Sequence, residues 1–290
     1  MAPISYVQAL VLGLVQGCSE LFPISSLGHS VVLPRLLGWD IHQNDDYFLT
    51  FLIATHLATA LVLVGFFARD WSRIVAGVAR SLRDRRIAAG DTDAKLGWLL
   101  VVGSIPAGIL GLALEHALRK AFASPTSAAA FIALNGVMLL GAERLRRGAP
   151  VEQAAGPEGD GRIARRLRFR EALGIGTAQA LALVPGFSRS GAAMGGGLLV
   201  GLSNEDAARF SFLLATPIIL AAAGLKLPDL IGAQGDHVRG QALVGALAAA
   251  VSAYLAVRFL LRFFETNRLT PFGIYCLVVG VALTIGFALT

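Results

Sequence analysis

One polar stretch interrupts the apolar sequence near the start of this 290-residue chain: Gln16-Gly-Cys-Ser-Glu20-Leu-Phe-Pro23-Ile-Ser25-Ser26-Leu-Gly28-His29. Apolar residues lead into it from Tyr6 and away from it towards Trp39. A carboxylate, hydroxyls and an imidazole are each costly to place in hydrocarbon unless they find partners. We therefore expect these side chains to face a cavity or a protein interior and to carry function.

A second polar stretch lies in the other half of the chain: Gln179-Ala-Leu-Ala-Leu-Val-Pro185-Gly186-Phe-Ser188-Arg189-Ser190-Gly191. One constant offset along the sequence aligns four positions of the two halves: Gly13 with Gly176, Gln16 with Gln179, Ser25 with Ser188 and Gly28 with Gly191. We therefore interpret the two stretches as halves of one site.

A further block of sequence supports a duplication. A nearly equal offset aligns Thr50-Phe-Leu-Ile-Ala-Thr55 with Ser211-Phe-Leu-Leu-Ala-Thr216. Self-similarity at a fixed period indicates internal repeats. The sequence thus predicts repeat one over about 1–147 and repeat two over about 168–290, joined by a basic linker over about 143–170.

The composition indicates a membrane protein. Hydrophobic residues make up 55% of the chain and charged residues only 15%, whereas a soluble domain carries roughly 25% charged residues. Six nearly uncharged segments have the length of about 20 residues that spans a bilayer as a helix. These segments are Phe48–Phe67, Leu96–Leu118, Thr126–Leu145, Ala207–Leu227, Ala242–Phe264 and Pro271–Leu289. We expect a single polytopic membrane domain over 1–290.

Each polar stretch joins two apolar runs that are too short to cross a bilayer. Breaks near Pro23 and Pro185 predict two broken re-entrant helical hairpins, because irregular backbone at membrane depth needs protein or water partners. The predicted fold class is an all-α integral membrane protein with about six full transmembrane helices and two such hairpins. Each half crosses the membrane three times, an odd number, so the second half is inserted in the opposite orientation to the first. The sequence therefore predicts an inverted-topology repeat with its site near the midplane.

The net charge of +6 is concentrated in two arginine-rich loops, Arg69–Lys95 and Glu143–Arg170. An even number of crossings separates them, so the positive-inside rule places both in the cytoplasm. Both termini and the mouth of the first hairpin are then expected outside. We interpret the charge as a topology signal and expect no nucleic-acid partner. The N-terminus lacks the pattern of a cleavable signal peptide, so none is expected.

The first stretch carries groups suited to acid–base and phosphate chemistry. Gln16 and Glu20 are four residues apart and share a helix face. Glu20 can act as a base, a metal ligand or the partner of a buried arginine. Ser25 and Ser26 lie at the break, where hydroxyls and free backbone N–H groups can face an anion. His29 can carry a proton near neutral pH.

The second stretch carries Arg189 between Ser188 and Ser190. A guanidinium forks onto a phosphate or carboxylate through two hydrogen bonds, so this group is typical of an oxyanion clamp. A structural ion pair between Glu20 and Arg189 is the alternative. For His56, in the middle of a span, a structural role is favoured.

At these residues the sequence resembles the bacterial undecaprenyl-pyrophosphate phosphatase family, also called the bacitracin-resistance protein family. The family motifs are (E/Q)-x-x-x-E running into P-x-S-S-x-G-H, and P-G-x-S-R-S. They stand here as Gln16…Glu20, Pro23-Ile-Ser25-Ser26-Leu27-Gly28-His29 and Pro185-Gly186-Phe187-Ser188-Arg189-Ser190. The resemblance covers essentially the whole chain, and two long motifs in the right order are a specific signal.

The resemblance implies an enzyme of the bacterial plasma (inner) membrane that removes the terminal phosphate of undecaprenyl pyrophosphate at the outer face. Such an enzyme recycles the lipid carrier for peptidoglycan synthesis and confers bacitracin resistance. The implied partners are a polyprenyl pyrophosphate lipid, the lipid bilayer and a divalent cation, Mg²⁺ or Ca²⁺. A homodimer is the assembly to test for.

Carried over by position, Ser26 is the implied nucleophile and His29 its proton partner or the acid for the leaving group. Glu20 is the implied base or metal ligand, with Gln16 as a weaker ligand. Arg189 and Ser188 would hold the pyrophosphate. Five further candidates for substrate binding are Ser190, Ser25, Gly28, Gly186 and Gln16. Direct attack by water, or by the other serine, stays open.

Three positions depart from the common family pattern. Leu27 and Ala193 stand where threonine is usual, and Gln16 stands where many members have an acid. A second class of function is a secondary transporter or flippase for an anionic lipid phosphate, because inverted repeats with broken helices are typical of transporters. A transporter needs a clamp but no nucleophile beside a proton carrier, so Ser26 and His29 favour the enzyme.

Overall fold

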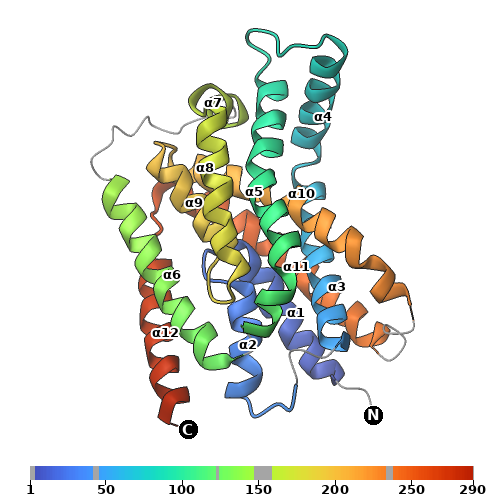
Figure 1. Cartoon of the computed structure of the whole chain (residues 1–290), viewed down its shortest axis with the longest axis vertical. Helices are drawn as coiled ribbons and strands as arrows, with labels where there is room; N and C mark the ends of the chain where they lie inside the picture. The colour runs from blue at the N-terminus through green and yellow to red at the C-terminus, as the bar shows by residue number, and fades with distance from the viewer. Residues whose placement is uncertain (1–3, 42–45, 122–123, 147–158, 233–237, 290) are drawn as a thin grey trace.

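The computed structural model describes residues 4–41, 46–121, 124–146, 159–232 and 238–289 (Figure 1). Within these ranges the regular structure is helical and contains no strand. In chain order the elements are α1 (Tyr6–Leu21), α2 (Ser26–Leu36), α3 (Asp46–Phe66), α4 (Ala68–Arg83), α5 (Thr92–Ala121), α6 (Pro125–Arg146), α7 (Gly159–Arg166), α8 (Phe169–Gln179), the 3₁₀ helix η1 (Ala180–Leu183), α9 (Arg189–Leu199), α10 (Asn204–Ile231), α11 (Arg239–Thr266) and α12 (Thr270–Leu289).

Six helices in the described ranges are long and apolar enough to cross a membrane, which confirms the six predicted segments. They are Tyr47–Phe66, Thr92–Leu114, Pro125–Arg146, Asn204–Lys226, Arg239–Thr266 and Thr270–Leu289. Their length is that of a bilayer-spanning helix. The all-α membrane fold is therefore confirmed.

Two helix–break–helix hairpins flank the site. α1 and α2 are separated by a break over 22–25, and α8 with η1 is separated from α9 by a break over 184–188. A serine caps the helix after each break, since Gly28 N–H donates to Ser25 Oγ at 3.1 Å and Gly191 N–H donates to Ser188 Oγ at 3.0 Å. α2 and α9 have 11 residues each, too few to cross a bilayer.

The order of one hairpin and three candidate spans occurs twice, as α1–α2 with α3, α5 and α6, and as α8–α9 with α10, α11 and α12. The repeat boundaries themselves stay a prediction. Residues 147–158 of the predicted linker lie outside the described residues. So do 42–45 and the two chain ends, 1–3 and 290.

Each hairpin packs closely against a span of the other half at a glycine. α1 lies along α11, and α8 lies along α5. A Cβ on Gly13 would overlap the Gly245 carbonyl oxygen, and a Cβ on Gly176 would overlap the Gly103 carbonyl oxygen. Gly13 and Gly176 are aligned in the sequence repeat, so the two halves exchange equivalent contacts. Small residues let helix backbones approach this closely in membranes.

The arginine-rich region predicted as a loop over Arg69–Lys95 instead forms α4 and the start of α5, so that prediction is wrong in part. Ile74, Gly77 and Ser81 are buried at helical spacing, and α4 packs along α5 through this face. An amphipathic helix is as polar on average as a loop, and only the positions of its apolar residues distinguish the two.

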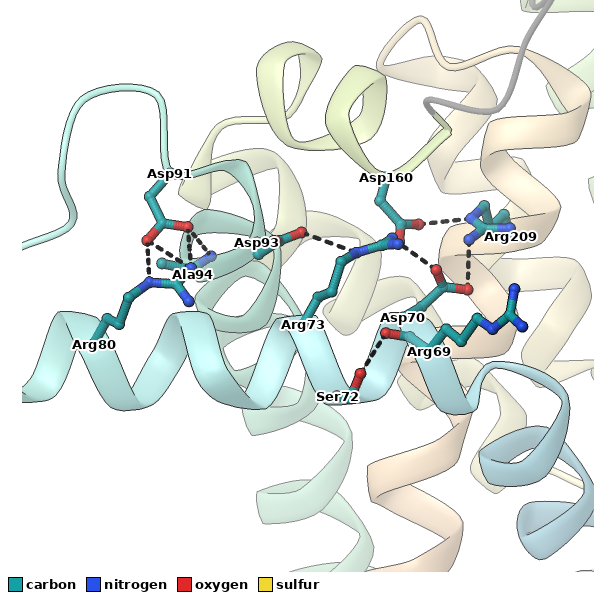
Figure 2. Close-up of polar contacts among 10 residues, drawn as sticks. All are labelled: Arg69, Asp70, Ser72, Arg73, Arg80, Asp91, Asp93, Ala94, Asp160 and Arg209. Atoms are coloured by element: carbon teal, nitrogen blue, oxygen red, sulfur yellow. Dashed lines mark hydrogen bonds and ion pairs between the residues drawn. The ribbon is translucent and has the colours of Figure 1, made fainter.

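The base of α4 is held by ionic side chains of α4, α7 and α10, and Arg73 Nε also lies 3.7 Å from Asp93 Oδ1 of α5 (Figure 2). Arg209 of α10 donates to Asp160 Oδ1 of α7 at 2.6 Å and to Asp70 Oδ2 of α4 at 2.7 Å. Arg73 Nη2 lies 2.7 Å from Asp70 Oδ1 and 3.0 Å from Asp160 Oδ2. Buried charges need such partners. The network therefore joins α4, α7 and α10.

Asp91 caps the first turn of α5 and ties it to α4. Its Oδ1 accepts the Ala94 N–H at 3.0 Å, and the guanidinium of Arg80 donates to both carboxylate oxygens, its closest contact being 3.1 Å (Figure 2). The backbone hydrogen bond from Ala94, with Arg80 acting in the same direction, lowers the pKa of Asp91. The carboxylate is therefore ionised at neutral pH and suits the N-terminus of a helix.

We expect Gly176→Ala to destabilise the protein, because the added methyl group overlaps the α5 backbone at Gly103. Overpacking of this kind costs about 1–3 kcal/mol. The matched control is Gly174→Ala on the same helix, where a Cβ meets nothing within 4 Å. Thermal unfolding in detergent should show a lower midpoint for Gly176→Ala only. Equal midpoints for the two variants would contradict the close approach of α8 and α5.

We expect Asp160→Asn to lower the unfolding midpoint, because it weakens the charged hydrogen bonds to Arg209 and Arg73 at a 5%-exposed position. The cost is about 1–3 kcal/mol. Asp84→Asn is the control, since Asp84 pairs with its exposed neighbour Arg83 and such surface pairs contribute little. A shift that is as large for Asp84→Asn would show that the network does not anchor α4.

Candidate active site

The break of the first hairpin places three predicted side chains in contact. Ser26 Oγ, at the start of α2, donates to Glu20 Oε2 at 2.5 Å. Gln16 Nε2, one turn before Glu20 on α1, donates to the same oxygen at 2.9 Å. Gln16 is fully buried, and Glu20 and Ser26 are each 8% exposed. One carboxylate oxygen is therefore held from both sides of the break.

Arg189 brings the second hairpin to the same carboxylate. It is the first residue of α9, and its Nη2 donates to Glu20 Oε1. The two polar stretches, far apart in sequence, thus meet at one buried ion pair. Such a pair is favourable in an apolar interior only when further hydrogen bonds satisfy both groups, and Gln16 and Ser26 supply two of these to Glu20.

His56 of α3 also contacts this carboxylate. Its Nε2 lies 3.3 Å from Glu20 Oε2, and its Nδ1 lies 2.7 Å from the Leu52 carbonyl oxygen. From the sequence, His56 is ambiguous and a structural role is favoured. A signal was present, since His56 directly follows the duplicated block Thr50–Thr55.

The serines of the second stretch bond the backbone of the first. Ser188 Oγ and Ser190 Oγ lie 3.0 Å apart, and both donate to the Phe22 carbonyl oxygen, at 3.5 and 3.0 Å respectively. Phe22 belongs to the break, where carbonyl groups lack a helical partner. These contacts join the two breaks directly, and the predicted role of Ser188 and Ser190 in substrate binding stays a prediction.

Two glycines let the breaks approach each other. A Cβ on Gly28 would lie 3.0 Å from the Cα of Gly186. Gly186 has a φ of +107°, a conformation that residues with a Cβ rarely adopt. Ser25, with a φ of +74°, is strained in the same sense and caps α2. The contacts of Gly28, Gly186 and Ser25 shape the two breaks. The role of these residues in substrate binding stays a prediction.

Asn135 of α6 satisfies one backbone group in each break, a role that the sequence analysis missed. Its Nδ2 donates to the Pro23 carbonyl oxygen at 2.9 Å, and its Oδ1 accepts the Ser188 N–H at 3.0 Å. The side chain is fully buried. A lone amide inside the apolar segment Thr126–Leu145 is the sequence signal that could have identified it.

His29 points towards α12 in this arrangement. Its Nδ1 lies 2.7 Å from the Ser25 carbonyl oxygen and its Nε2 lies 3.0 Å from the Tyr275 hydroxyl. Among the contacts of the described residues, Ser26 Oγ bonds Glu20 and none joins it to His29. A proton-transfer role for His29 therefore stays a prediction, and Glu20 is the nearer acceptor.

A cavity of 220 Å³ lies between α3 and α10 beside the ion pair. Arg189 and His56 form part of its wall, and most of the remaining wall is apolar. The other lining residues are Leu49, Leu52, Ile53, Ile219, Ala222, Ala223 and Lys226. An apolar pocket with a few convergent polar groups is typical of a ligand site.

The oxygen atoms at the break suit a cation that is held mainly by a substrate. Within the described ranges no cluster of three or more His, Cys, Asp or Glu side chains could hold a metal. Gln16 Oε1, however, is buried without a hydrogen-bond partner and lies on the side chain that contacts Glu20. Mg²⁺ is commonly held by one or two carboxylates together with substrate phosphates. The donor set fits that arrangement and not an all-protein cage.

Comparison with known proteins identifies close relatives along the whole chain. The family model described as "Bacitracin resistance protein BacA" matches residues 9–282. "Undecaprenyl-diphosphatase" of Mycolicibacterium paratuberculosis is 51% identical, with 99% of each chain covered. "Undecaprenyl-diphosphatase 2" of Frankia alni is 44% identical over 100% of both chains, and the protein of the same name from Chromobacterium violaceum is 43% identical over 95% of this chain and 96% of its own.

We expect Asn135→Leu to loosen both breaks at once, because it leaves the Pro23 carbonyl and the Ser188 N–H without their partner. Each unsatisfied buried group costs about 1–3 kcal/mol. Hydrogen exchange should rise in both 22–26 and 184–188. Leu134→Ala, at the adjacent half-exposed position on α6, is the control. Faster exchange at one break alone would contradict the bridging role.

Proposed function

We infer that this chain, which belongs to the bacitracin resistance protein BacA family, hydrolyses undecaprenyl diphosphate to undecaprenyl phosphate and inorganic phosphate. The names of the relatives support this activity. One observation of the site supports it most directly: the Ser26 hydroxyl donates to Glu20 at 2.5 Å beside the cavity that Arg189 lines. A hydroxyl, a carboxylate and a guanidinium are the groups that phosphoryl transfer to a side chain requires.

In the proposed reaction Ser26 Oγ attacks the terminal phosphorus while its proton passes to Glu20. The bond from that phosphorus to the bridging oxygen breaks, and undecaprenyl phosphate leaves with the bonding electron pair. Water then hydrolyses the phosphoserine, which regenerates Ser26 and releases inorganic phosphate. Glu20 is placed to act as the base because it already accepts the Ser26 hydrogen bond.

Arg189 would bind the phosphate oxygens. A guanidinium has five N–H donors, and one of the two terminal nitrogens of Arg189 contacts Glu20 while the side chain also lines the cavity. A charged, hydrogen-bonded clamp of this kind stabilises charge that develops in the transition state. The pair with Glu20 holds the guanidinium in place before the substrate arrives.

A divalent cation, Mg²⁺ or Ca²⁺, is part of the proposal. Glu20 and Gln16 Oε1 would hold it together with the phosphates, which suits the unpartnered amide oxygen of Gln16. When bound, the cation neutralises phosphate charge and polarises the phosphorus–oxygen bonds.

The proposed location is the bacterial inner membrane, with the site facing outward. The six apolar helices make the chain a multi-pass membrane protein. The arginine-rich regions around α4 and α7 favour the cytoplasm for that end of the molecule, which leaves the α1–α2 hairpin opening outside. There the enzyme would recycle the lipid carrier of peptidoglycan synthesis and so confer bacitracin resistance.

A transporter or flippase for an anionic lipid phosphate is the second candidate. The meeting of two broken hairpins at a buried arginine favours it, because such breaks form substrate sites in transporters. Phosphate release distinguishes the two functions.

We expect detergent-purified protein to release phosphate from undecaprenyl diphosphate and to lose this activity in EDTA until Mg²⁺ or Ca²⁺ is restored. Ser26→Ala removes the nucleophile and Arg189→Ala removes the clamp, so each should lower the rate by at least about 100-fold. Ser104→Ala is the control, since that hydroxyl donates within α5 to the Leu100 carbonyl. Folded wild-type protein that releases no phosphate would exclude the enzyme, and lipid transport in liposomes would then be measured.

A further inference from the structure

His56 contacts Glu20, the carboxylate proposed as the base, but has no role in the mechanism above. α3 brings its Nε2 to 3.3 Å from Glu20 Oε2, and the ring also lines the cavity with Arg189. The side chain is 26% exposed. It therefore faces the place where substrate would bind instead of being enclosed in packed side chains.

The ring orientation of His56 is fixed by its other nitrogen. Nδ1 lies 2.7 Å from the Leu52 carbonyl oxygen. A carbonyl oxygen only accepts, so Nδ1 carries a hydrogen and donates it. Nε2 is then the ring atom directed at Glu20, 3.3 Å from Oε2, and it donates to the carboxylate when both ring nitrogens carry a hydrogen.

The two oxygens of Glu20 are held by different helices. Arg189 of α9 contacts Oε1, whereas Oε2 receives Ser26 and Gln16 from the first hairpin and His56 from α3. A carboxylate held only by the guanidinium can rotate into a two-pronged pair with it. Contacts on Oε2 oppose that rotation, and His56 is the one that comes from outside the first hairpin.

We propose that His56 is a positioning residue for Glu20: its Nε2 holds Oε2 where the carboxylate accepts the Ser26 hydroxyl and Arg189 keeps donors for phosphate. This inference rests on the proposed phosphatase function. It assigns His56 to the orientation of the base and not to substrate affinity. Loss of this contact should therefore slow the chemical step and leave substrate binding nearly unchanged.

A purely packing role for His56 makes a different prediction. Packing would be preserved by a ring of similar size, so His56→Phe would be tolerated. Positioning requires an N–H group that reaches Glu20, so His56→Phe would be impaired and His56→Gln, which carries a side-chain N–H donor, would recover much of the loss.

The experiment measures kcat and KM for phosphate release by wild type, His56→Phe and His56→Gln, together with their thermal midpoints. We expect His56→Phe to lower kcat by about 10- to 100-fold, the usual effect of losing a partner that orients a functional group, with KM within about threefold of wild type. His56→Gln should regain most of the lost kcat. Thr59→Val, one turn further along α3, is the control, since its hydroxyl donates to the Thr55 carbonyl.

A double-mutant cycle tests whether His56 acts through Glu20. If it does, His56→Phe should cause no further loss in a Glu20→Gln background, because residues that act as a unit are not additive. Independent, additive losses would overturn the inference. His56→Leu takes the place of His56→Phe if the latter does not fold.

The remaining outcomes separate this inference from the proposed function. Active wild type with an equally active, folded His56→Phe overturns the inference alone. A His56→Gln variant as impaired as His56→Phe, or an effect on KM without one on kcat, overturns it too. Folded wild type without any phosphate release overturns the proposed function and, with it, the positioning role.

Discussion

The buried ion pair between Glu20 and Arg189 joins the two hairpins where both are broken. An unpaired charge at membrane depth is costly, so each side chain requires the other or a ligand of opposite charge. The two side chains of this pair therefore join the hairpins and also belong to the candidate active site. The carboxylate that satisfies Arg189 also accepts the Ser26 hydroxyl, and the guanidinium that satisfies Glu20 lines the cavity next to it. A diphosphate is anionic, so it could pair with Arg189 but not with Glu20.

A second constraint comes from the backbone. Each break frees peptide groups that hydrocarbon cannot satisfy, and polar side chains of the motifs supply the partners. Ser188 and Ser190 donate to the Phe22 carbonyl, and Asn135 bridges Pro23 and Ser188. The polar motifs therefore contain two kinds of residue. Some build the breaks, whereas Arg189 lines the cavity between α3 and α10.

The surrounding helices pack closely around this arrangement. Gly13 and Gly176 bring each hairpin into backbone contact with a span of the other half. At the far end of the molecule, Arg209 ties the start of α10 to α4 and α7. α10 also forms one wall of the cavity. Charged groups held in fixed positions stabilise a transition state without reorganising during the reaction.

The sequence by itself determined the membrane class, the six spans, the two hairpins and the side chains at their breaks. Apolar length and the cost of polar groups in lipid are local properties, readable without knowing any contact. The tertiary structure alone decided that His56 contacts Glu20 and that Asn135 bridges both breaks. These features depend on which helices pack together, and packing between distant segments leaves no periodic signal in the chain.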